Sequence, residues 1–241
     1  MADPLHQFEI IPLVPLNIAG VDVSFTNSSL WMMIAILISI VFMTIVTKRP
    51  AMVPGRMQVF AETLYEFIAG MVRDNIGSRG REYFPLIFTI FVVVLLGNML
   101  GMIPYSFTYT SHIAVTMGLA LSIFIFVTIL GFVKHGLHFF SLFCPAGVPF
   151  FLMPLIIPIE IISYMIRPVT LSVRLFANMM AGHLMLKVFA GFSIAMGVGL
   201  GLAPMFFNVA LIGFEFLIAF LQAYVFTILS CIYLKDAIEL H

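Results

Sequence analysis

The chain has 241 residues, of which 62% are hydrophobic and only 9% are charged, and its mean hydropathy is +1.16. Soluble domains carry about 25% charged residues, so this composition excludes an ordinary soluble protein and predicts an integral membrane protein. The formal net charge is zero, which argues against nucleic acid as a partner. Cys144 and Cys231 give no disulfide framework and are interpreted as small apolar residues. No cleavable signal is evident, because the first apolar run starts only after Ser28.

The first third of the chain predicts an outer segment, a span and a surface helix. Residues 1–28 are punctuated by prolines and are expected to lie in or near the outer interface. A first span is predicted from Leu30 to Thr47, which is long enough to cross a bilayer. From Arg56 to Asn75 apolar residues recur at intervals of three and four, so an amphipathic interfacial helix is predicted over residues 54–78.

Two further spans are predicted in the middle of the chain. They run from Phe84 to Ile103 and from about His112 to Val133, with only a short turn between them. A loop is expected over residues 137–149, where prolines interrupt the chain.

The last part of the chain predicts a long helical hairpin over residues 150–234. Its turn is expected from Gly197 to Pro204, and its last helix from about Met205 to Leu234. The expected fold is therefore a single all-α membrane domain, residues 1–241, with about five membrane-embedded helices plus the interfacial helix.

Basic residues are distributed unevenly between the connections. None lies in residues 1–28 or 104–111, whereas the connection between the first and second spans holds Lys48, Arg49, Arg56, Arg73, Arg79 and Arg81. The positive-inside rule then predicts that the N-terminus lies outside and the C-terminus inside. The first helix of the long hairpin therefore runs from the inner to the outer side.

That helix carries a stripe of polar side chains. Five of them project from nearly one face: Glu160, Arg167, Thr170, Arg174 and Asn178. A guanidinium near the bilayer centre costs on the order of 3 kcal/mol, so an intramembrane arginine is a functional hypothesis by default. The stretch from Pro158 to Phe189 would be about 48 Å long as a straight helix, so it is expected to tilt, kink or extend beyond the bilayer.

Depth in the membrane groups these residues with polar residues of the returning helix. Arg174 lies about 20 Å outward of Glu160 along the helix axis, and His183 lies about 13 Å further. On the returning helix Glu215 comes first, and Gln222 follows deeper on the same face. His183 and Glu215 should therefore share the outer half, while Arg174 and Gln222 share the middle. Because Glu160 is left in the inner half, the arrangement predicts two offset half-paths for protons rather than one pore.

Arg174 itself cannot relay a proton, because a guanidinium stays charged at physiological pH. A fixed buried cation favours the ionised form of a carboxylic acid that approaches it, and so forces that acid to release its proton. A mobile partner bearing such acids would be protonated from one half-path and discharged into the other. The same charge would stop protons from passing straight through.

Two motifs resemble those of a known family. RPVTLSVRLFANMMAGH, from Arg167 to His183, is followed by ALIGFEFLIAFLQAYVFTILSCIYL, from Ala210 to Leu234. Together they resemble subunit a of the F-type ATP synthase, the stator subunit that conducts protons beside the rotating ring of c subunits. The resemblance covers most of the chain, and it implies that the last two helices lie steeply tilted against that ring.

The resemblance also implies roles for individual residues. The essential charge that faces the c-ring carboxylate falls on Arg174, with Gln222 opposite it, and the family's asparagine falls on Asn178. The inner-path glutamate falls on Glu160. His183 and Glu215 occupy the outer-path positions in the order of the mitochondrial and alphaproteobacterial type, since some bacterial relatives carry these two residue types exchanged.

The implied partners are the c-subunit ring, the b subunits of the peripheral stalk, the soluble catalytic head through the complex, and membrane lipid. The chain is expected to need no cofactor and to be no enzyme by itself, because it has neither GxxxxGK nor GxGxxG for binding a nucleotide. The implied location is the bacterial plasma membrane, with the mitochondrial inner membrane as the alternative.

Several alternatives stay open at this point. Arg167 is either a structural partner for Glu160 or an anchor for a lipid phosphate. Asn98, beside Gly97 and Gly101, is interpreted as a polar contact that packs helices together rather than as a functional group. His183 taken alone could equally be a hydrogen-bonded helix contact.

A metal site and a substrate transporter are the alternatives to proton conduction. His135, His138 and Cys144 match no firm ligand pattern, so no metal site is predicted. The alternative to a stator subunit is a self-contained ion-coupled transporter whose midplane arginine binds an anionic substrate. The sequence shows no internal repeat, which disfavours the transporter.

Overall fold

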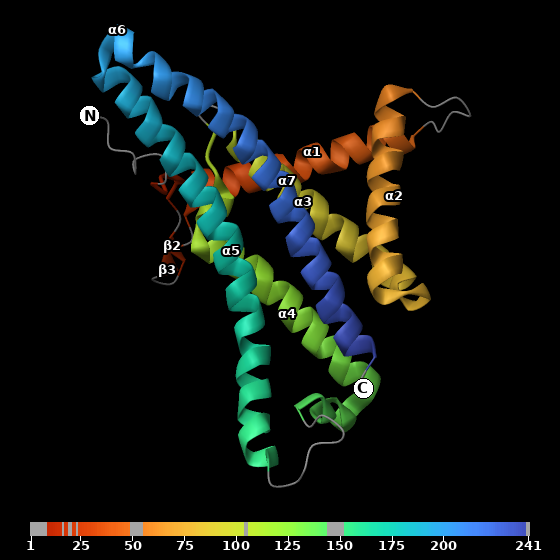
Figure 1. The fold of residues 1–241 in the computed structure, drawn as a ribbon. Helices are drawn as coiled ribbons and strands as arrows, with labels where there is room; N and C mark the ends of the chain where they lie inside the picture. The colour runs from red at the N-terminus through yellow and green to blue at the C-terminus, as the bar shows by residue number, and fades with distance from the viewer. Residues whose placement is uncertain are drawn as a thin grey trace.

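The computed structural model describes residues 9–15, 17–18, 21–22, 24–48, 55–103, 106–143 and 152–239. Within this part of the chain, five helical segments are long and apolar enough to cross a membrane: Asn27–Thr47, Ser78–Gly101, Ile113–His135, Met153–Ala195 and Leu202–Ile238. The predicted all-α membrane fold is therefore confirmed (Figure 1).

Short strands precede the first span, a feature that the sequence did not predict. β1 (Pro12–Val14) pairs antiparallel with β4 (Phe25–Thr26), and β2 (Asn17–Ile18) pairs with β3 (Val21–Asp22). Helix α1 (Asn27–Thr47) then begins three residues earlier than predicted. The reason is a cap, because the Thr26 hydroxyl accepts a hydrogen bond from the backbone N–H of Ser29 at 3.4 Å.

Helices α1 and α2 (Arg56–Ile76) run in different directions. In Figure 1, α2 lies across the direction of α1 at the edge of the molecule. Helix α1 buries little of its surface, whereas α2 packs Ile68, Met71 and Val72 into the main core. If α1 crosses the bilayer, α2 lies along its surface, which agrees with the predicted interfacial helix.

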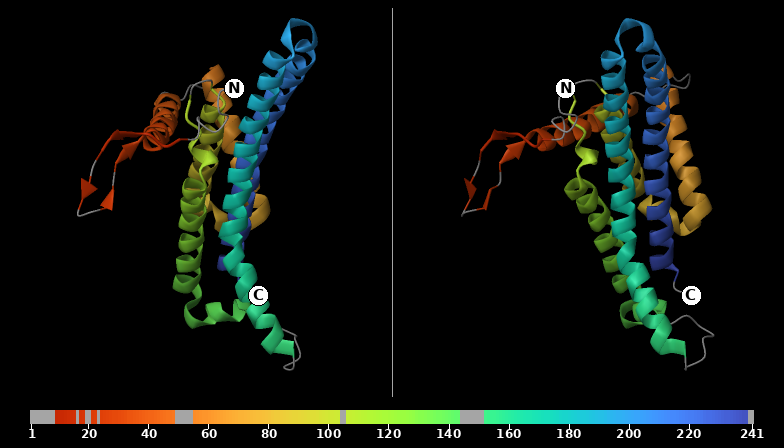
Figure 2. Two further views of the ribbon diagram at one scale, coloured as in Figure 1. Left: turned by 90° about the vertical axis from the view of Figure 1, so that its left-hand side faces the viewer. Right: turned by 60° about the vertical axis from the view of Figure 1, so that its left-hand side comes forward.

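The main core joins α2 to two layers of helices. Helix α3 (Phe84–Gly101) packs chiefly against α7 (Leu202–Ile238), and α4 (Ile113–His135) packs chiefly against α5 (Met153–Ala195). The fully buried side chains at these contacts include Phe91, Leu175 and Phe226. In Figure 2 the α5 and α7 pair lies on one side of the α3 and α4 pair. Arg174 on α5 is exposed, so the packing of these helices leaves its side chain uncovered.

The connections on the two sides of α4 are partly helical. Residues 106–112, which include the 3-10 turn η3 (Tyr109–Ser111), are mostly buried between α3 and α5. After α4 the chain turns at Gly136, whose φ of +55° suits glycine, and continues as the 3-10 helix η4 (Gly136–Phe143). The loop expected over residues 137–149 therefore begins as a helix, while Cys144 lies outside the described residues.

The long hairpin begins with α5 at Met153, three residues after the predicted start, and ends at Ile238, four residues beyond the predicted end. Helices α5, of 43 residues, and α7, of 37 residues, are joined by the single-turn α6 (Gly197–Leu200). Most of the expected turn is thus helical, since Pro204 falls in the first turn of α7, where its missing N–H is tolerated. Straight helices of these lengths would measure about 65 and 55 Å against about 30 Å of hydrocarbon, so both must tilt.

Helix α5 also changes direction within its first half (Figure 1, Figure 2). This half contains Pro158 and Pro168, and each proline removes a backbone hydrogen bond from the helix interior. The change of direction, one of the outcomes expected for this long stretch, therefore has a physical basis in its two prolines.

Candidate functional site

Arg174 is the middle residue of α5, with as many helical residues before it as after it. Its side chain is exposed on the surface of the folded chain, as is that of Thr170 one turn earlier. The Thr170 hydroxyl donates to the backbone carbonyl of Arg167 at 3.0 Å, so it is engaged with its own helix. The hydroxyl hydrogen of Thr170 is therefore already used within α5, and only its lone pairs remain for another donor.

An amide pair lies one turn beyond Arg174. Asn178 Nδ2 donates to Gln222 Oε1 at 2.8 Å, which links the middle of α5 to the middle of α7. Gln222 is buried, and its Nε2 has no hydrogen-bond partner within the described part of the chain. The resemblance set Gln222 opposite Arg174, but the contact that the structure gives Gln222 is to Asn178. The pair holds the two helices in register beside the exposed guanidinium.

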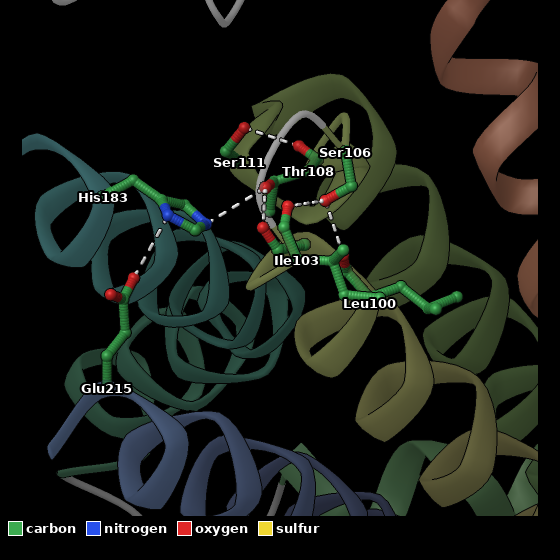
Figure 3. Close-up of polar contacts among 8 residues, drawn as sticks. Leu100, Ile103, Ser106, Thr108, Ser111, His183 and Glu215 are labelled. Carbon is green, nitrogen blue, oxygen red and sulfur yellow. Dashed lines mark hydrogen bonds and ion pairs between the residues drawn. The ribbon is translucent and has the colours of Figure 1, made fainter. Parts of the chain in front are cut away.

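His183 and Glu215 come together between α5 and α7. His183 Nδ1 lies 3.3 Å from Glu215 Oε1, and the two residues are 9% and 4% exposed (Figure 3). Comparing depth on two antiparallel helices predicted this encounter. A carboxyl group and an imidazole at this separation can share a proton, and burial excludes bulk water as a competing donor or acceptor.

Gly182 creates the space for the Glu215 carboxyl group. A Cβ atom at Gly182 would lie 2.6 Å from Glu215 Oε1 and 2.9 Å from its Cδ. The carboxyl group therefore rests against the bare backbone of α5, next to His183. Sequence reasoning did not identify this role, although the signal was present as the glycine directly before the histidine in the AGH motif.

Thr108 is a second residue that sequence reasoning missed. Its Oγ1 lies 3.0 Å from His183 Nε2 and donates to the carbonyl of Gly101 at 3.1 Å (Figure 3). Thr108 belongs to the buried connection between α3 and α4, where burial also raises the pKa of the Tyr109 hydroxyl and keeps it neutral. The only signal in the sequence was the polar run around Thr108 in a short turn between two apolar spans.

The structure corrects the partner proposed for Arg167. Its Nη1 lies 2.8 Å from Asp236 Oδ2 on α7, and its guanidinium lies 5.4 Å from the Tyr164 ring and 5.1 Å from the Tyr233 ring. The proposed pairing with Glu160 is wrong, because residues seven apart are separated by about 10 Å along a helix axis. The returning helix α7, by contrast, brings Asp236 directly alongside.

Glu160 is half-buried on α5, fourteen residues before Arg174. Within the described ranges it has no hydrogen bond or ion pair, so its carboxyl group is available to water or to a neighbouring protein. It lies on the opposite side of Arg174 from His183 along the helix. The structure thus separates the predicted inner and outer groups, with the arginine between them.

Two further polar residues tie the helices together. Asn98 Nδ2 donates to the carbonyl of Ala219 at 3.2 Å. This hydrogen bond joins α3 to α7, in agreement with the interpretation of Asn98 as a helix-packing residue. His135 Nε2 lies 3.2 Å from the carbonyl of Ile238 at the end of α7. Within the described ranges no group of three potential metal ligands occurs.

The polar groups therefore form three separate centres along α5 and α7. Arg167 and Asp236 lie near one end, Arg174 and the amide pair lie in the middle, and His183 with Glu215 lies toward the other end. Titratable groups on both sides of a fixed, exposed cation can exchange protons with a partner that passes that cation. Within the described residues, no hydrogen bond or ion pair connects one titratable centre to the next through the middle.

Comparisons with known proteins agree with this picture. A family model described as ATP synthase A chain matches residues 29–235. A protein of Rhodospirillum rubrum named ATP synthase subunit a is 58% identical over 241 residues, covering 100% of each chain. Proteins with the same name from Parvibaculum lavamentivorans and Paramagnetospirillum magneticum are 56% and 53% identical and cover 98% and 100% of this chain, and 94% and 100% of their own.

All three relatives come from alphaproteobacteria, in agreement with the type that the order of His183 and Glu215 indicated. The matched region includes both motifs on which the resemblance was based. The chain therefore belongs to the ATP synthase A chain family, the family of ATP synthase subunit a.

Proposed function

We propose that this chain is the proton-conducting stator subunit in the membrane sector of an F-type ATP synthase. It provides two offset half-channels to a rotating ring of c subunits and so couples proton flow to ATP synthesis. The observation that carries the proposal is the position of Arg174, exposed in the middle of a 43-residue apolar helix.

An exposed guanidinium at that position needs a partner. Facing lipid costs on the order of 3 kcal/mol on insertion scales, which is a large fraction of a free energy of folding of about 5–15 kcal/mol. The surface around Arg174 is therefore covered by water or by another protein that brings an anion. A c-ring carboxylate meets this requirement, because the guanidinium favours its ionised form at the moment of contact.

The two half-channels follow from the groups on either side of Arg174. His183 and Glu215, about 13 Å further along α5, serve the outer path and exchange protons with a c-ring carboxylate. Glu160, about 21 Å in the other direction, serves the inner path. A proton crosses between the paths only on the ring, because Arg174 repels it from the direct route.

Asn178 and Gln222 have a supporting role in this proposal. Their hydrogen bond fixes α5 against α7 one turn from Arg174, so that the guanidinium is presented at a constant height. Neither amide titrates, so they position the site and carry no proton. Thr170 supports the same surface one turn earlier on α5.

A self-contained transporter fits these observations less well. A transporter of that kind would enclose its substrate-binding arginine in a cavity near the midplane. Arg174 instead lies on an exposed surface. A cavity of about 560 Å³ lies between α2 and the start of α3, and the arginines that line it are Arg73 and Arg81 rather than Arg174. The transporter therefore remains the weaker candidate.

The proposed partners are the c ring at the Arg174 surface, the b subunits of the peripheral stalk, and the catalytic head through the complex. The five apolar helices make the chain a multi-pass membrane protein, and its bacterial relatives favour the bacterial plasma membrane as its location. The long hairpin, residues 150–234, carries the proton path in this proposal, and no cofactor is required for it.

The proposal is tested by changing Arg174 in the assembled complex. Arg174→Lys and Arg174→Ala should both abolish ATP-driven proton pumping in vesicles, because a desolvated lysine can lose its proton whereas arginine does not. Passive proton leak should rise in Arg174→Ala, and Gln222→Leu should pump at a reduced rate. Arg79 is an exposed arginine in η2 (Ser78–Tyr83). The variant Arg79→Lys is therefore the control and should pump normally. Near-normal coupled pumping in Arg174→Ala would overturn the proposal.

A further inference from the structure

We infer that Thr108 is a positioning residue for proton transfer, whose hydroxyl holds His183 in the tautomer that is protonated at Nε2 and open at Nδ1 toward Glu215. The inference rests on the proposed role of His183 and Glu215 in the outer half-channel. It concerns a residue in a connecting segment that lies outside both helices of the long hairpin.

The Thr108 hydroxyl has two neighbours, and one of them, a backbone carbonyl, can only receive its proton. Oγ1 lies 3.1 Å from the carbonyl oxygen of Gly101 and 3.0 Å from Nε2 of His183. A carbonyl oxygen only accepts, so the hydroxyl donates to Gly101 and presents lone pairs to His183. Nε2 must then carry a hydrogen to complete the contact. In the neutral imidazole this leaves Nδ1 without one.

The donation to Gly101 is held in place by the local structure. Gly101 is the last residue of α3, where backbone carbonyls lack a partner within the helix, and it is buried. A Cβ atom at Gly101 would lie 2.6 Å from Thr108 Cγ2, so the glycine permits the close approach. Ser111 Oγ donates to the backbone carbonyl of Thr108 at 2.6 Å and fixes the connection from its other side (Figure 3). Among the described residues the Thr108 hydroxyl is the donor to the Gly101 carbonyl, so turning it toward His183 would remove that hydrogen bond.

The tautomer decides whether the outer pair can exchange a proton. Glu215 Oε1 faces Nδ1 at 3.3 Å, so the Nδ1 lone pair can receive a proton from the carboxylic acid. The O–H bond of Glu215 breaks as the N–H bond at Nδ1 forms, which gives a carboxylate and an imidazolium. That imidazolium is satisfied on both sides, by Glu215 at Nδ1 and by Thr108 at Nε2. In the other tautomer, a hydrogen on Nδ1 would block this transfer.

The tautomer can be measured directly by ¹⁵N magic-angle-spinning NMR of the complex in lipid, with ¹⁵N-labelled histidine. The difference between the wild type and His183→Gln isolates the His183 signals. We expect a protonated Nε2 and an unprotonated, hydrogen-bonded Nδ1 in the wild type. A His183 protonated at Nδ1 and bare at Nε2 would overturn the inference without any variant of Thr108.

Variants of Thr108 test the effect on transport. Thr108→Val keeps the shape and removes the hydroxyl, and it should slow ATP-driven pumping about three- to tenfold, the ratio expected for one lost hydrogen bond. Thr108→Ser keeps the hydroxyl and should pump close to the wild-type rate. The matched control is Thr116→Val. The Thr116 hydroxyl is also buried, and its contacts are the Ser172 hydroxyl of α5 at 3.1 Å and backbone carbonyls of its own turn, none of which is a titratable side chain.

The outcomes separate this inference from the proposed function. If His183→Gln abolishes pumping while Thr108→Val pumps normally, the inference fails and the outer path stands. If His183→Gln pumps normally, the proposed outer path fails, whichever tautomer the spectrum gives. Equal losses in Thr108→Ser and Thr108→Val, or in Thr116→Val and Thr108→Val, would assign the effect to packing and overturn the inference.

Discussion

Replacing Gly182 by alanine should separate His183 from Glu215 without altering either titratable group. The added Cβ would lie 2.6 Å from Glu215 Oε1, whereas ordinary contact begins at 3.4 Å. Because the clash comes from α5, relieving it moves the carboxyl group away from the helix that carries His183. The distance between Oε1 and Nδ1 is already 3.3 Å, so a retreat of about 0.8 Å takes the pair out of hydrogen-bond reach.

The size of the effect follows from the contact that is lost. A hydrogen bond that involves a charged group contributes about 1.5–3 kcal/mol, and each 1.36 kcal/mol changes a rate tenfold. If transfer between the two groups limits the outer path, Gly182→Ala should pump protons roughly ten- to a hundredfold more slowly. The measurement is ATP-driven acidification of proteoliposomes that contain the assembled complex, normalised to the amount of complex.

Gly191→Ala provides the control on the same helix. A Cβ atom at Gly191 meets nothing within 4 Å, and alanine favours a helix over glycine by roughly 0.5–1 kcal/mol, so this variant should assemble and pump normally. Pumping by Gly182→Ala within twofold of the wild type, in complex assembled to the same level, would refute the reasoning.

Three further predictions concern other contacts. Exchanging His183 and Glu215 together should retain more pumping than either single replacement by the other's residue, and strictly additive losses would argue against a functional pair. A double-mutant cycle of Arg167→Ala and Asp236→Ala in thermal unfolding should give a coupling of about 1 kcal/mol, since the pair is partly exposed; zero coupling would make the ion pair irrelevant to stability. Cysteines at positions 3 and 241 in sealed vesicles should be labelled from opposite sides, and labelling from one side would contradict five crossings.

The sequence by itself determined the membrane class, the approximate spans and the position of the central arginine. These features are local, because a bilayer requires every backbone polar group of an apolar run to be satisfied within the run. Helical periodicity then groups side chains on one face, which is why Arg174, Thr170 and Asn178 could be assigned to a stripe. Because two adjacent helices run antiparallel, residue spacing also predicts that His183 and Glu215 lie at the same depth, and the structure brings this pair together.

Only the tertiary structure decided which faces of the helices meet. The partner of Arg167 is Asp236 rather than Glu160, because the returning helix α7 packs alongside α5 and brings Asp236 next to Arg167. Thr108 reaches His183 from a segment 75 residues away, and no periodicity links a turn residue to a helix beyond it. Gly182 matters for the space it leaves to Glu215, which is a property of two packed helices and not of either alone. Packing places such contacts to within a fraction of an ångström, whereas sequence spacing fixes only height and direction along one helix.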